Sequence, residues 1–287
     1  MTEHLATITA AEGEIPVVVS DRGVAAIREI DPELAVTTIM DVIAGDHLAR
    51  LRERVKNAPD LAFTRVDEVR FTAPYRSPRK IWGIGLNYGD HAADLSESAP
   101  DQPASFVKCD HTIIGPDEPI VIPAQSERTT SEAEIGLIIG RTCENVSESE
   151  AMDYVWGVTT ILDQTAEDIL RINPRYLTRS KNFRTFFCFG PELVPLDEVI
   201  EKFESLDDIE ISTVKNGDEF RTNTVAHMTH KPASLVSFHS KMMPLFPGDI
   251  ISTGTPGALV IGDGDRVECR IDGIGQLTTT ARKATTR

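Results

Sequence analysis

Two glutamates separated by a single residue, Glu132 and Glu134, have the spacing that metal chemistry requires. They lie in residues 131–140, where four aliphatic side chains and the absence of proline predict a strand. Side chains alternate between the faces of a strand, so both carboxylates project from one face, roughly 7 Å apart. A hard divalent ion such as Mg²⁺, Mn²⁺ or Ca²⁺ would relieve their repulsion. A solvated edge strand would explain the same pattern, and this stretch alone leaves both interpretations open.

A third carboxylate comes from Asp163, which ends a strongly β-forming segment, residues 155–163. A charged group at the end of a buried strand needs a partner, and the cation between the two glutamates would provide one. Three carboxylates leave positions on a six-coordinate ion for water and a chelating substrate.

A histidine and an aspartate three residues apart, His91 and Asp94, follow a short apolar strand and a glycine-rich turn. On a helix they share one face, so Asp94 could orient His91 to take a proton from water. A surface ion pair is the alternative. Residues 96–103 are polar, contain two prolines, and form a candidate lid. The glycines of the turn lack the spacing of a dinucleotide-binding loop.

A dense basic run occupies residues 171–184 of an otherwise acidic chain. It is either a set of salt bridges at the rim or a landing site for a substrate carboxylate. Further along, a glycine–threonine turn offers backbone N–H groups and the Thr255 hydroxyl to a carboxylate oxygen. The basic run consists of Arg171, Arg175, Arg179, Lys181 and Arg184.

The elements that must position these residues fall into two parts. Residues 1–72 form a small N-terminal domain with a helix that Asp46 caps, and the proline-rich residues 73–78 lead into a domain spanning 73–287. Closely spaced short strands and two hairpin turns, Asn216-Gly217 and Asp272-Gly273, predict a β-rich, layered or rolled α+β fold. A short helix is expected at 147–151 and another at 233–243.

The composition of the chain limits the classes of protein to which it can belong. The 287 residues carry a formal net charge of −16, which disfavours nonspecific binding to nucleic acid and to anionic membranes. The four cysteines form no Cys-x-x-Cys pair, and no apolar run approaches the ~20 residues that span a bilayer, so we expect a soluble, cytoplasmic protein. Phosphate-binding and serine-hydrolase motifs are missing. We interpret the other internal histidines as structural: His47, His111, His227, His230 and His239.

Five motifs in sequence order resemble the fumarylacetoacetate hydrolase family over residues 72–280. They are Gly-Leu-Asn-Tyr-x-x-His, Glu-Ala-Glu, the strand-terminal Asp, Lys-x-Phe and Thr-Gly-Thr-Pro-Gly. The resemblance implies a β-rich, mixed β-roll fold with a small N-terminal α/β domain, usually as a homodimer. It also implies Mg²⁺ or Mn²⁺ held by three carboxylates, which match Glu132, Glu134 and Asp163.

The same resemblance implies roles for further residues. His91 matches the catalytic histidine, with Asp94 where many relatives have Glu, and Lys181 matches a lysine close to substrate and metal. Thr255 matches a threonine that contacts a substrate carboxylate. We therefore assign catalysis to His91, Asp94 and Lys181, and substrate binding to Tyr88, Lys108, Arg179 and Thr255. Leu162, Glu167 and Arg184 depart from the family pattern, and we expect Arg184 and Glu167 to form a swapped charge pair.

The resemblance implies a metal-dependent hydrolase that cleaves a C–C bond in a small 2-oxo acid of the acylpyruvate type. Alternatives that use the same enolate are decarboxylation or tautomerisation of oxaloacetate, isomerisation of 2-hydroxyhepta-2,4-diene-1,7-dioate, and dehydration or hydrolysis of a 2-keto-3-deoxy sugar acid. From another class, a non-catalytic ligand-binding protein would retain the fold. Retention of the three carboxylates with His91 and Lys181 argues against it.

Overall fold

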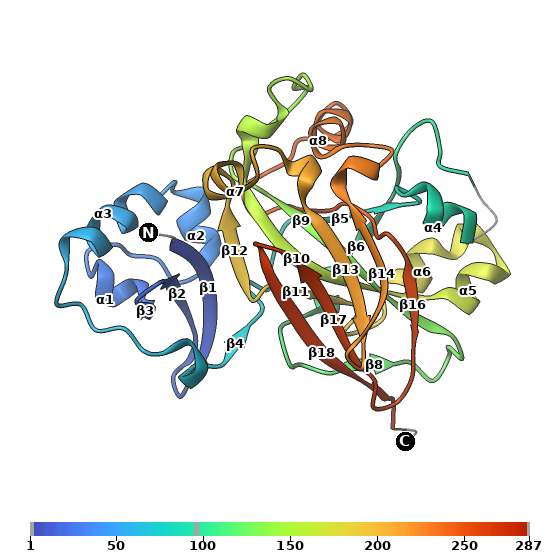
Figure 1. Ribbon diagram of the computed structural model, residues 1–287, viewed down its shortest axis with the longest axis horizontal. Helices are drawn as coiled ribbons and strands as arrows, with labels where there is room; N and C mark the ends of the chain where they lie inside the picture. The colour runs from blue at the N-terminus through green and yellow to red at the C-terminus, as the bar shows by residue number, and fades with distance from the viewer. Residues whose placement is uncertain (1–2, 95–97, 286–287) are drawn as a thin grey trace.

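The computed structural model of the chain describes residues 3–94 and 98–285. A small N-terminal unit, blue in Figure 1, lies beside a larger body built mostly of strands. The predicted α+β, β-rich class is confirmed. Within the two described ranges, none of the helices has the length and apolar character needed to cross a membrane.

The N-terminal unit is an antiparallel sheet with short helices packed against it. Its third helix begins one residue later than predicted. Asp46 has a positive φ of 52° and does not cap the helix, because His47 occupies the N-cap without a side-chain hydrogen bond. The elements are strands β1 (Glu3–Ala10), β2 (Gly13–Ser20), β3 (Gly23–Ala26) and β4 (Phe71–Thr72), helices α1 (Ile27–Ile30), α2 (Ile39–Ala44) and α3 (Leu48–Asn57), and the 3₁₀ turn η1 (Val66–Glu68).

The main sheet continues from the N-terminal strands in the order β3-β2-β1-β12-β10-β9-β15-β5-β6, with β4, β7, β11 and β16 paired alongside. Its further strands are β5 (Ile81–Gly85), β6 (Ala104–Lys108), β7 (Ile113–Ile114), β9 (Thr129–Ile139), β10 (Val155–Ala166), β11 (Phe187–Phe189), β12 (Glu192–Pro195), β15 (Ile250–Ser252) and β16 (Ala258–Ile261).

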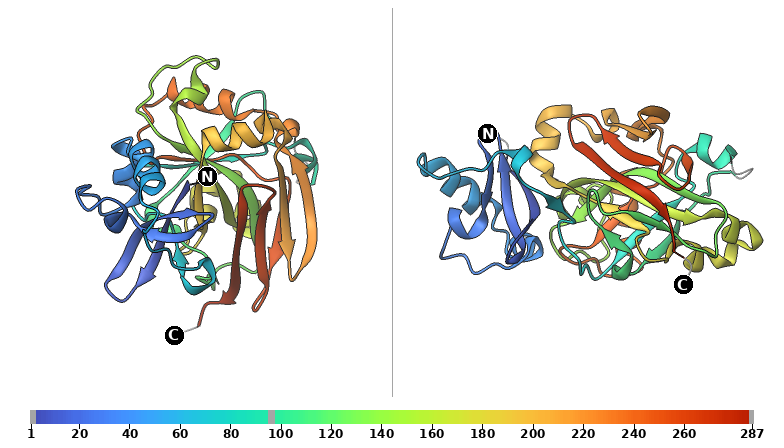
Figure 2. Two further views of the ribbon diagram at one scale, coloured as in Figure 1. Left: turned by 60° about the vertical axis from the view of Figure 1, so that its left-hand side comes forward. Right: turned by 90° about the horizontal axis from the view of Figure 1, so that it is seen from below.

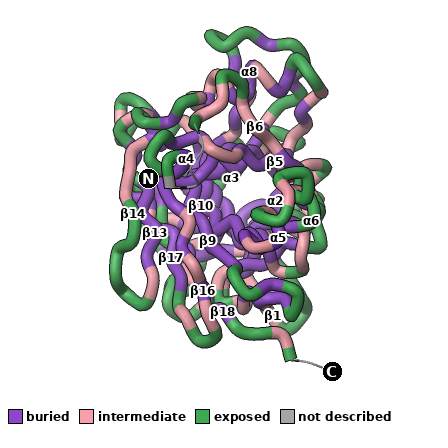
Figure 3. The backbone as a smooth tube through the Cα atoms, turned by 90° about the vertical axis from the view of Figure 1, so that its right-hand side faces the viewer, coloured by how far each residue is buried: buried purple, intermediate pink, exposed green. Residues whose placement is uncertain are grey.

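The strand that carries the two glutamates lies inside this sheet. β9 pairs with β10 along one side and with β15 and β16 along the other, and every residue of β9 is buried (Figure 3). The edge-strand interpretation is therefore wrong. Alternation had placed both carboxylates on one face, but only the long-range pairing shows that this face is buried.

A second sheet packs against β9 and β10 and encloses the main hydrophobic core (Figures 1 and 2). Both predicted hairpins occur in it, with Asn216-Gly217 between β13 and β14 and Asp272-Gly273 between β17 and β18. The strand order is β14-β13-β17-β18-β8. These strands are β8 (Ile120–Ile122), β13 (Glu210–Lys215), β14 (Asp218–Thr224), β17 (Arg266–Ile271) and β18 (Gly275–Lys283).

The helices of the main body are short. The helix expected at 233–243 is α8, which ends at Ser240, and the one expected at 147–151 is instead the 3₁₀ turn η3 that starts at Ala151. The helices of this part of the chain are α4 (Gly89–Asp94), α5 (Glu167–Ile172), α6 (Leu177–Lys181), α7 (Leu196–Phe203) and α8 (Pro232–Ser240). Its 3₁₀ turns are η2 (Asp110–Thr112), η3 (Ala151–Tyr154), η4 (Pro174–Tyr176), η5 (Leu206–Asp208) and η6 (Val225–His227).

The two parts of the molecule meet where β1 pairs with β12, Leu5 opposite Leu193. The predicted domain boundary after residue 72 stays a prediction, since this pairing makes the sheet continuous across both parts. A group of ionic side chains, called here the junction cluster, lies beside this pairing. Its members are Glu3, His4, Arg52, Glu192, Asp197 and Glu198.

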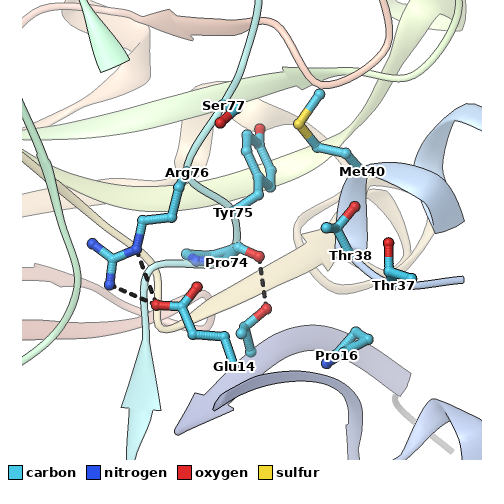
Figure 4. Close-up of a pocket in the computed structure, with 10 residues that line it drawn as sticks. Glu14, Pro16, Thr37, Thr38, Met40, Pro74, Tyr75, Arg76 and Ser77 are labelled. Carbon is cyan, nitrogen blue, oxygen red and sulfur yellow. Dashed lines mark hydrogen bonds and ion pairs between the residues drawn. The ribbon is translucent and has the colours of Figure 1, made fainter. Parts of the chain in front are cut away.

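A cavity of about 190 Å³ also opens at this junction, between α2 and residues 74–77 (Figure 4). Arg76 at its edge binds Glu14 at 2.9 Å and Glu118 at 2.7 Å, so its charge is already matched. Of the described residues that line the cavity, none belongs to the predicted site.

Candidate functional site

Three buried carboxylates converge on one face of the main sheet and form what we call the carboxylate site. Glu132 of β9 lies directly opposite Asp163 of β10, and Glu134 is two residues along the same face. One oxygen from each of the three side chains lies within 4.8 Å of the others. In the described residues this is the single group of three or more His, Cys, Asp or Glu side chains with such spacing. The sequence prediction of three neighbouring carboxylates is confirmed as geometry.

Both glutamates are held by hydrogen bonds that fix their orientation. The Glu134 carboxylate accepts from the Ser252 hydroxyl at 2.5 Å and from the Gly254 backbone N–H at 2.8 Å. Glu132 accepts from the Thr165 hydroxyl at 2.9 Å and from Thr130 at 3.2 Å. These bonds occupy one oxygen of each glutamate and hold both carboxylates in place.

The turn after β15 owes its position to a buried asparagine that sequence reasoning missed. The Asn87 side-chain amide donates to the Thr253 and His230 carbonyls and accepts from the His230 N–H. Gly254 has a φ of 96°, and a Cβ there would lie 2.8 Å from the Asn87 Cβ. Glycine is therefore required where the N–H reaches Glu134. The only sequence signal was the Gly-Leu-Asn-Tyr motif, which named Asn87 without showing its partners.

Lys181 enters the site from the end of α6. Its ammonium donates to Glu132 at 2.9 Å and to Asp163 at 2.7 Å, and it lies 4.6 Å from the centre of the Phe106 ring. Burial favours the neutral amine, but the charges of Asp163, Glu132 and Glu134 outweigh it and raise the Lys181 pKa. The Lys181 side chain therefore stays protonated.

Lys108 is also buried in the site, at the end of β6. Its ammonium lies 2.5 Å from an Asp163 oxygen and donates to the carbonyls of Gln164, Lys181 and Phe186 at 3.0, 2.7 and 2.6 Å. Burial lowers its pKa to about 8, although Asp163 acts in the opposite direction. The predicted substrate contact of Lys108 stays a prediction, and in this structure four acceptors already surround its three N–H donors.

His91 and Tyr88 are both buried beside the carboxylates. Burial alone would raise the Glu132 pKa, but the positive charges of Lys181 and His91 lower it, so His91 lies within electrostatic reach. Burial and the charge of Glu134 raise the Tyr88 pKa. His91 and Asp94 lie one turn apart on α4, as predicted. The Asp94 side chain and residues 95–97 lie outside what the structure describes, so the dyad and the lid stay predictions.

The other predicted substrate contacts differ in their surroundings. The Thr255 hydroxyl is buried and exchanges hydrogen bonds with the backbone of Gly257. Arg179 is exposed on α6, whereas Lys181 on the same helix is buried. Their roles as substrate contacts stay predictions.

The charge pair expected between Arg184 and Glu167 is a wrong prediction. Glu167 is buried and binds Arg128 at 2.6 Å and also Arg171, while Arg184 is exposed. Arg128 precedes β9, so its partner could not be inferred from the short segment that contains Glu167 and Arg184. One member of the basic run, Arg171, is thus a structural ion-pair partner.

The residues present fit a divalent ion. Burial and the neighbouring Asp163 raise the Glu134 pKa, because both disfavour its ionised form, and a bound cation would favour that form. One oxygen from each of the three carboxylates lies within 4.8 Å of the others, so they can converge on one ion. Carboxylate oxygens are the ligands that hard divalent ions prefer.

Comparisons with known proteins agree with this geometry. The family model for the C-terminal domain of fumarylacetoacetate (FAA) hydrolase matches residues 80–282. Mitochondrial oxaloacetate tautomerase Fahd2a of Rattus norvegicus is 30% identical over 263 residues, which cover 89% of this chain and 82% of that protein.

Two solved structures are similar over nearly the whole chain. Maleylpyruvate hydrolase from Sphingobium sp. SYK-6, in complex with manganese(II) ion and pyruvate, has a TM-score of 0.81 and 26% identity, and the match covers 99% of this chain and 100% of that one. 5-Carboxymethyl-2-hydroxymuconate delta-isomerase from Mycobacterium smegmatis has a TM-score of 0.77 and 28% identity, with the same coverage. With the family model matching most of its length, the chain belongs to the fumarylacetoacetate hydrolase family.

Proposed function

We propose that the protein is a divalent-metal-dependent hydrolase that cleaves a C–C bond in a small 2-oxo acid of the acylpyruvate type. The observation that carries the proposal is the convergence of Glu132, Glu134 and Asp163 at a buried position beside Lys181 and His91. Burial and Asp163 disfavour the ionised form of Glu134, and a bound cation would favour it.

In this proposal the three carboxylates hold Mg²⁺ or Mn²⁺, with Ca²⁺ as a further candidate. The bound ion supplies Lewis acidity to the oxygens of a 2-oxo acid. The manganese and pyruvate bound by the similar maleylpyruvate hydrolase support this ligand class.

Each side chain of the site has a separate role in the proposed reaction. His91, oriented by Asp94, takes a proton from the water that attacks the distal carbonyl carbon. The C–C bond breaks toward the 2-oxo acid, whose carbon leaves as an enolate, and the distal part becomes a carboxylic acid. Lys181 remains protonated and stabilises the negative charge on the enolate oxygen, since its carboxylate neighbours raise its pKa. The proton on His91 returns to the enolate carbon. Tyr88, Arg179 and Thr255 contact the substrate.

A second candidate is tautomerisation or isomerisation of a 2-oxo acid. It is favoured by similarity to oxaloacetate tautomerase Fahd2a and to the M. smegmatis isomerase. The same enolate would form, but His91 would move a proton between two positions of the substrate without addition of water.

A substrate panel with added Mn²⁺ separates the candidates. It contains an acylpyruvate, oxaloacetate, 2-hydroxyhepta-2,4-diene-1,7-dioate and a 2-keto-3-deoxy sugar acid, with products identified by NMR. Hydrolysis gives stoichiometric pyruvate and a second acid, whereas tautomerisation gives an isomer of unchanged mass. Tight Mn²⁺ binding with no turnover of any compound would contradict an enzymatic role and favour a ligand-binding protein. We also propose a cytoplasmic homodimer, which light scattering on the purified protein and fractionation of cells would test.

A further inference from the structure

One face of β6 contacts Lys181 at two points, its ammonium and its main-chain carbonyl. Phe106 and Lys108 are two residues apart on this strand, so they project from one face, and both are buried. The Phe106 ring lies under the Lys181 ammonium, and the Lys108 ammonium binds the Lys181 main-chain carbonyl. Lys181 is therefore held at its charged tip and at its backbone by residues of one strand.

Space for the Phe106 ring is provided by a glycine on the neighbouring strand. Gly83 of β5 is the direct partner of Phe106 across the β5–β6 ladder. A Cβ at Gly83 would lie 2.2 Å from the ring. The aromatic ring thus occupies the position that a side chain would take, and its face is presented to Lys181.

Lys108 connects three separate segments of the site. It donates to the Gln164 carbonyl on β10, to the Lys181 carbonyl at the end of α6, and to the Phe186 carbonyl before β11. Its ammonium also pairs with Asp163. An ammonium has three N–H donors, and four acceptors at 3.0 Å or less already surround it, so little capacity remains for a substrate.

We propose that Lys108 and Phe106 are positioning residues, which set the place of the Lys181 ammonium and of the Asp163 carboxylate rather than contact the substrate. The proposal deepens the proposed function, on which its catalytic consequence rests. Its structural consequence is independent of any reaction: without Lys108, the end of α6 and the Asp163 carboxylate lose a shared anchor.

The first test is the crystal structure and Mn²⁺ affinity of Lys108→Met, which keeps an unbranched side chain one atom shorter and removes the ammonium. We expect the Lys181 ammonium to move by more than about 1 Å from Glu132 or Asp163. We expect Mn²⁺ affinity measured by electron paramagnetic resonance to fall about 10-fold, because the loss of Asp163 from its position outweighs the removal of one positive charge. Neither readout needs turnover, so failure of the proposed reaction would leave this test intact. An unmoved Lys181 together with unchanged Mn²⁺ affinity would overturn the proposal.

The second test separates positioning from substrate binding by kinetics on the substrate that the panel identifies. A positioning role predicts that kcat of Lys108→Met falls about 10- to 100-fold with KM within about 3-fold of the wild type. A substrate contact would instead raise KM at least 10-fold with kcat nearly unchanged, which would contradict the proposal. Phe106→Leu removes only the ring, and we expect a smaller fall in kcat with unaltered Mn²⁺ affinity.

A matched control is Lys80→Met. Lys80 also forms an ion pair with a buried aspartate, Asp249, at 2.6 Å, but that pair lies outside the carboxylate site. If loss of any buried lysine–aspartate pair weakened Mn²⁺ binding equally, the effect of Lys108→Met would report general destabilisation and the proposal would fail. We expect Lys80→Met to lower the melting temperature while the Mn²⁺ affinity stays at the wild-type value.

Discussion

The junction cluster and the carboxylate site are both dense groups of charged side chains, and they differ in burial: the three carboxylates are buried, whereas most of the junction side chains stay partly exposed. At the junction, burial would lower the His4 pKa, but Glu192 and Glu198 raise it to about 9. The Glu198 pKa falls to about 2, because hydrogen bonds from His4, Glu3 and Arg52 outweigh its burial. These ionised forms stabilise each other.

In the carboxylate site the shifts are mixed: Lys181 and Glu132 shift toward their charged forms, but two groups shift toward their neutral forms. Burial and Asp163 raise the Glu134 pKa, and burial lowers the Lys108 pKa to about 8. The junction cluster therefore behaves as a finished structural contact, partly open to water, whereas the carboxylate site buries a carboxylate whose ionised form a bound cation would favour. Dense charge alone does not mark a functional site; the convergence of three buried carboxylates distinguishes this one.

The substitution with the largest expected effect on the difference between the two clusters is Glu134→Gln, which removes one charge but keeps the shape of the side chain. We expect Mn²⁺ affinity, measured by calorimetry, to fall at least about 100-fold and turnover to be lost. Glu192→Gln is the control at the junction and should leave Mn²⁺ affinity unaltered. Wild-type affinity in Glu134→Gln would remove Glu134 from the ligand set.

His91→Asn tests the proton-transfer role beside the carboxylates. We expect kcat to fall by roughly 10²- to 10⁴-fold, the usual contribution of a general base, while Mn²⁺ still binds. The comparison variant is His47→Asn, because His47 lies at the N-cap of α3 in the N-terminal unit, outside the carboxylate site. Retained turnover in His91→Asn would show that another group moves the proton.

Addition of Mn²⁺ should stabilise the fold through the carboxylate site alone. At 100 times its dissociation constant, a ligand that binds only the native state adds about 2.7 kcal/mol to the free energy of unfolding. For a chain of this size that corresponds to a rise in melting temperature of roughly 5 °C. Scanning calorimetry should show the rise in the wild type and in Glu192→Gln, but not in Glu134→Gln.

The smallest expected effect is the pH dependence that His4 adds to stability. Its folded pKa is about 9, above the unfolded value of 6.5, so the contribution is complete below pH 6.5 and is lost as the pH rises through 9. We expect roughly 2 kcal/mol for this partly exposed group. Urea unfolding at pH 6 and pH 9.5 should show this loss in the wild type, and His4→Gln should lack it. An equal loss in both proteins would assign it to other groups.

The features that could be predicted from the sequence are those that depend only on neighbouring residues or on a known motif. The turns at Asn216-Gly217 and Asp272-Gly273 define hairpins by themselves, and strand alternation placed Glu132 and Glu134 on one face. Motif order then added Asp163. Each of these inferences needs only neighbouring residues or a known motif.

Contacts between distant segments could not be predicted in this way. Ser252 and Gly254 hold Glu134 from about 120 residues away, and Arg128 takes the partner expected for Arg184. A lysine at a strand end has the same sequence signature whether its ammonium lies in water or, like that of Lys108, among three carbonyls. Burial decides between them, and burial is a property of the assembled sheets.

Because Glu132 lies directly opposite Asp163, binding of the ion depends on the register of β10 against β9. A slip of β10 by one residue against β9 would turn Asp163 to the opposite face, toward the apolar core between the sheets. Chains with that error would retain strands and compactness but lose the third ligand. During refolding, the recovery of Mn²⁺ binding would therefore follow the recovery of native strand signal and report the fraction of molecules in which the two longest strands have paired correctly.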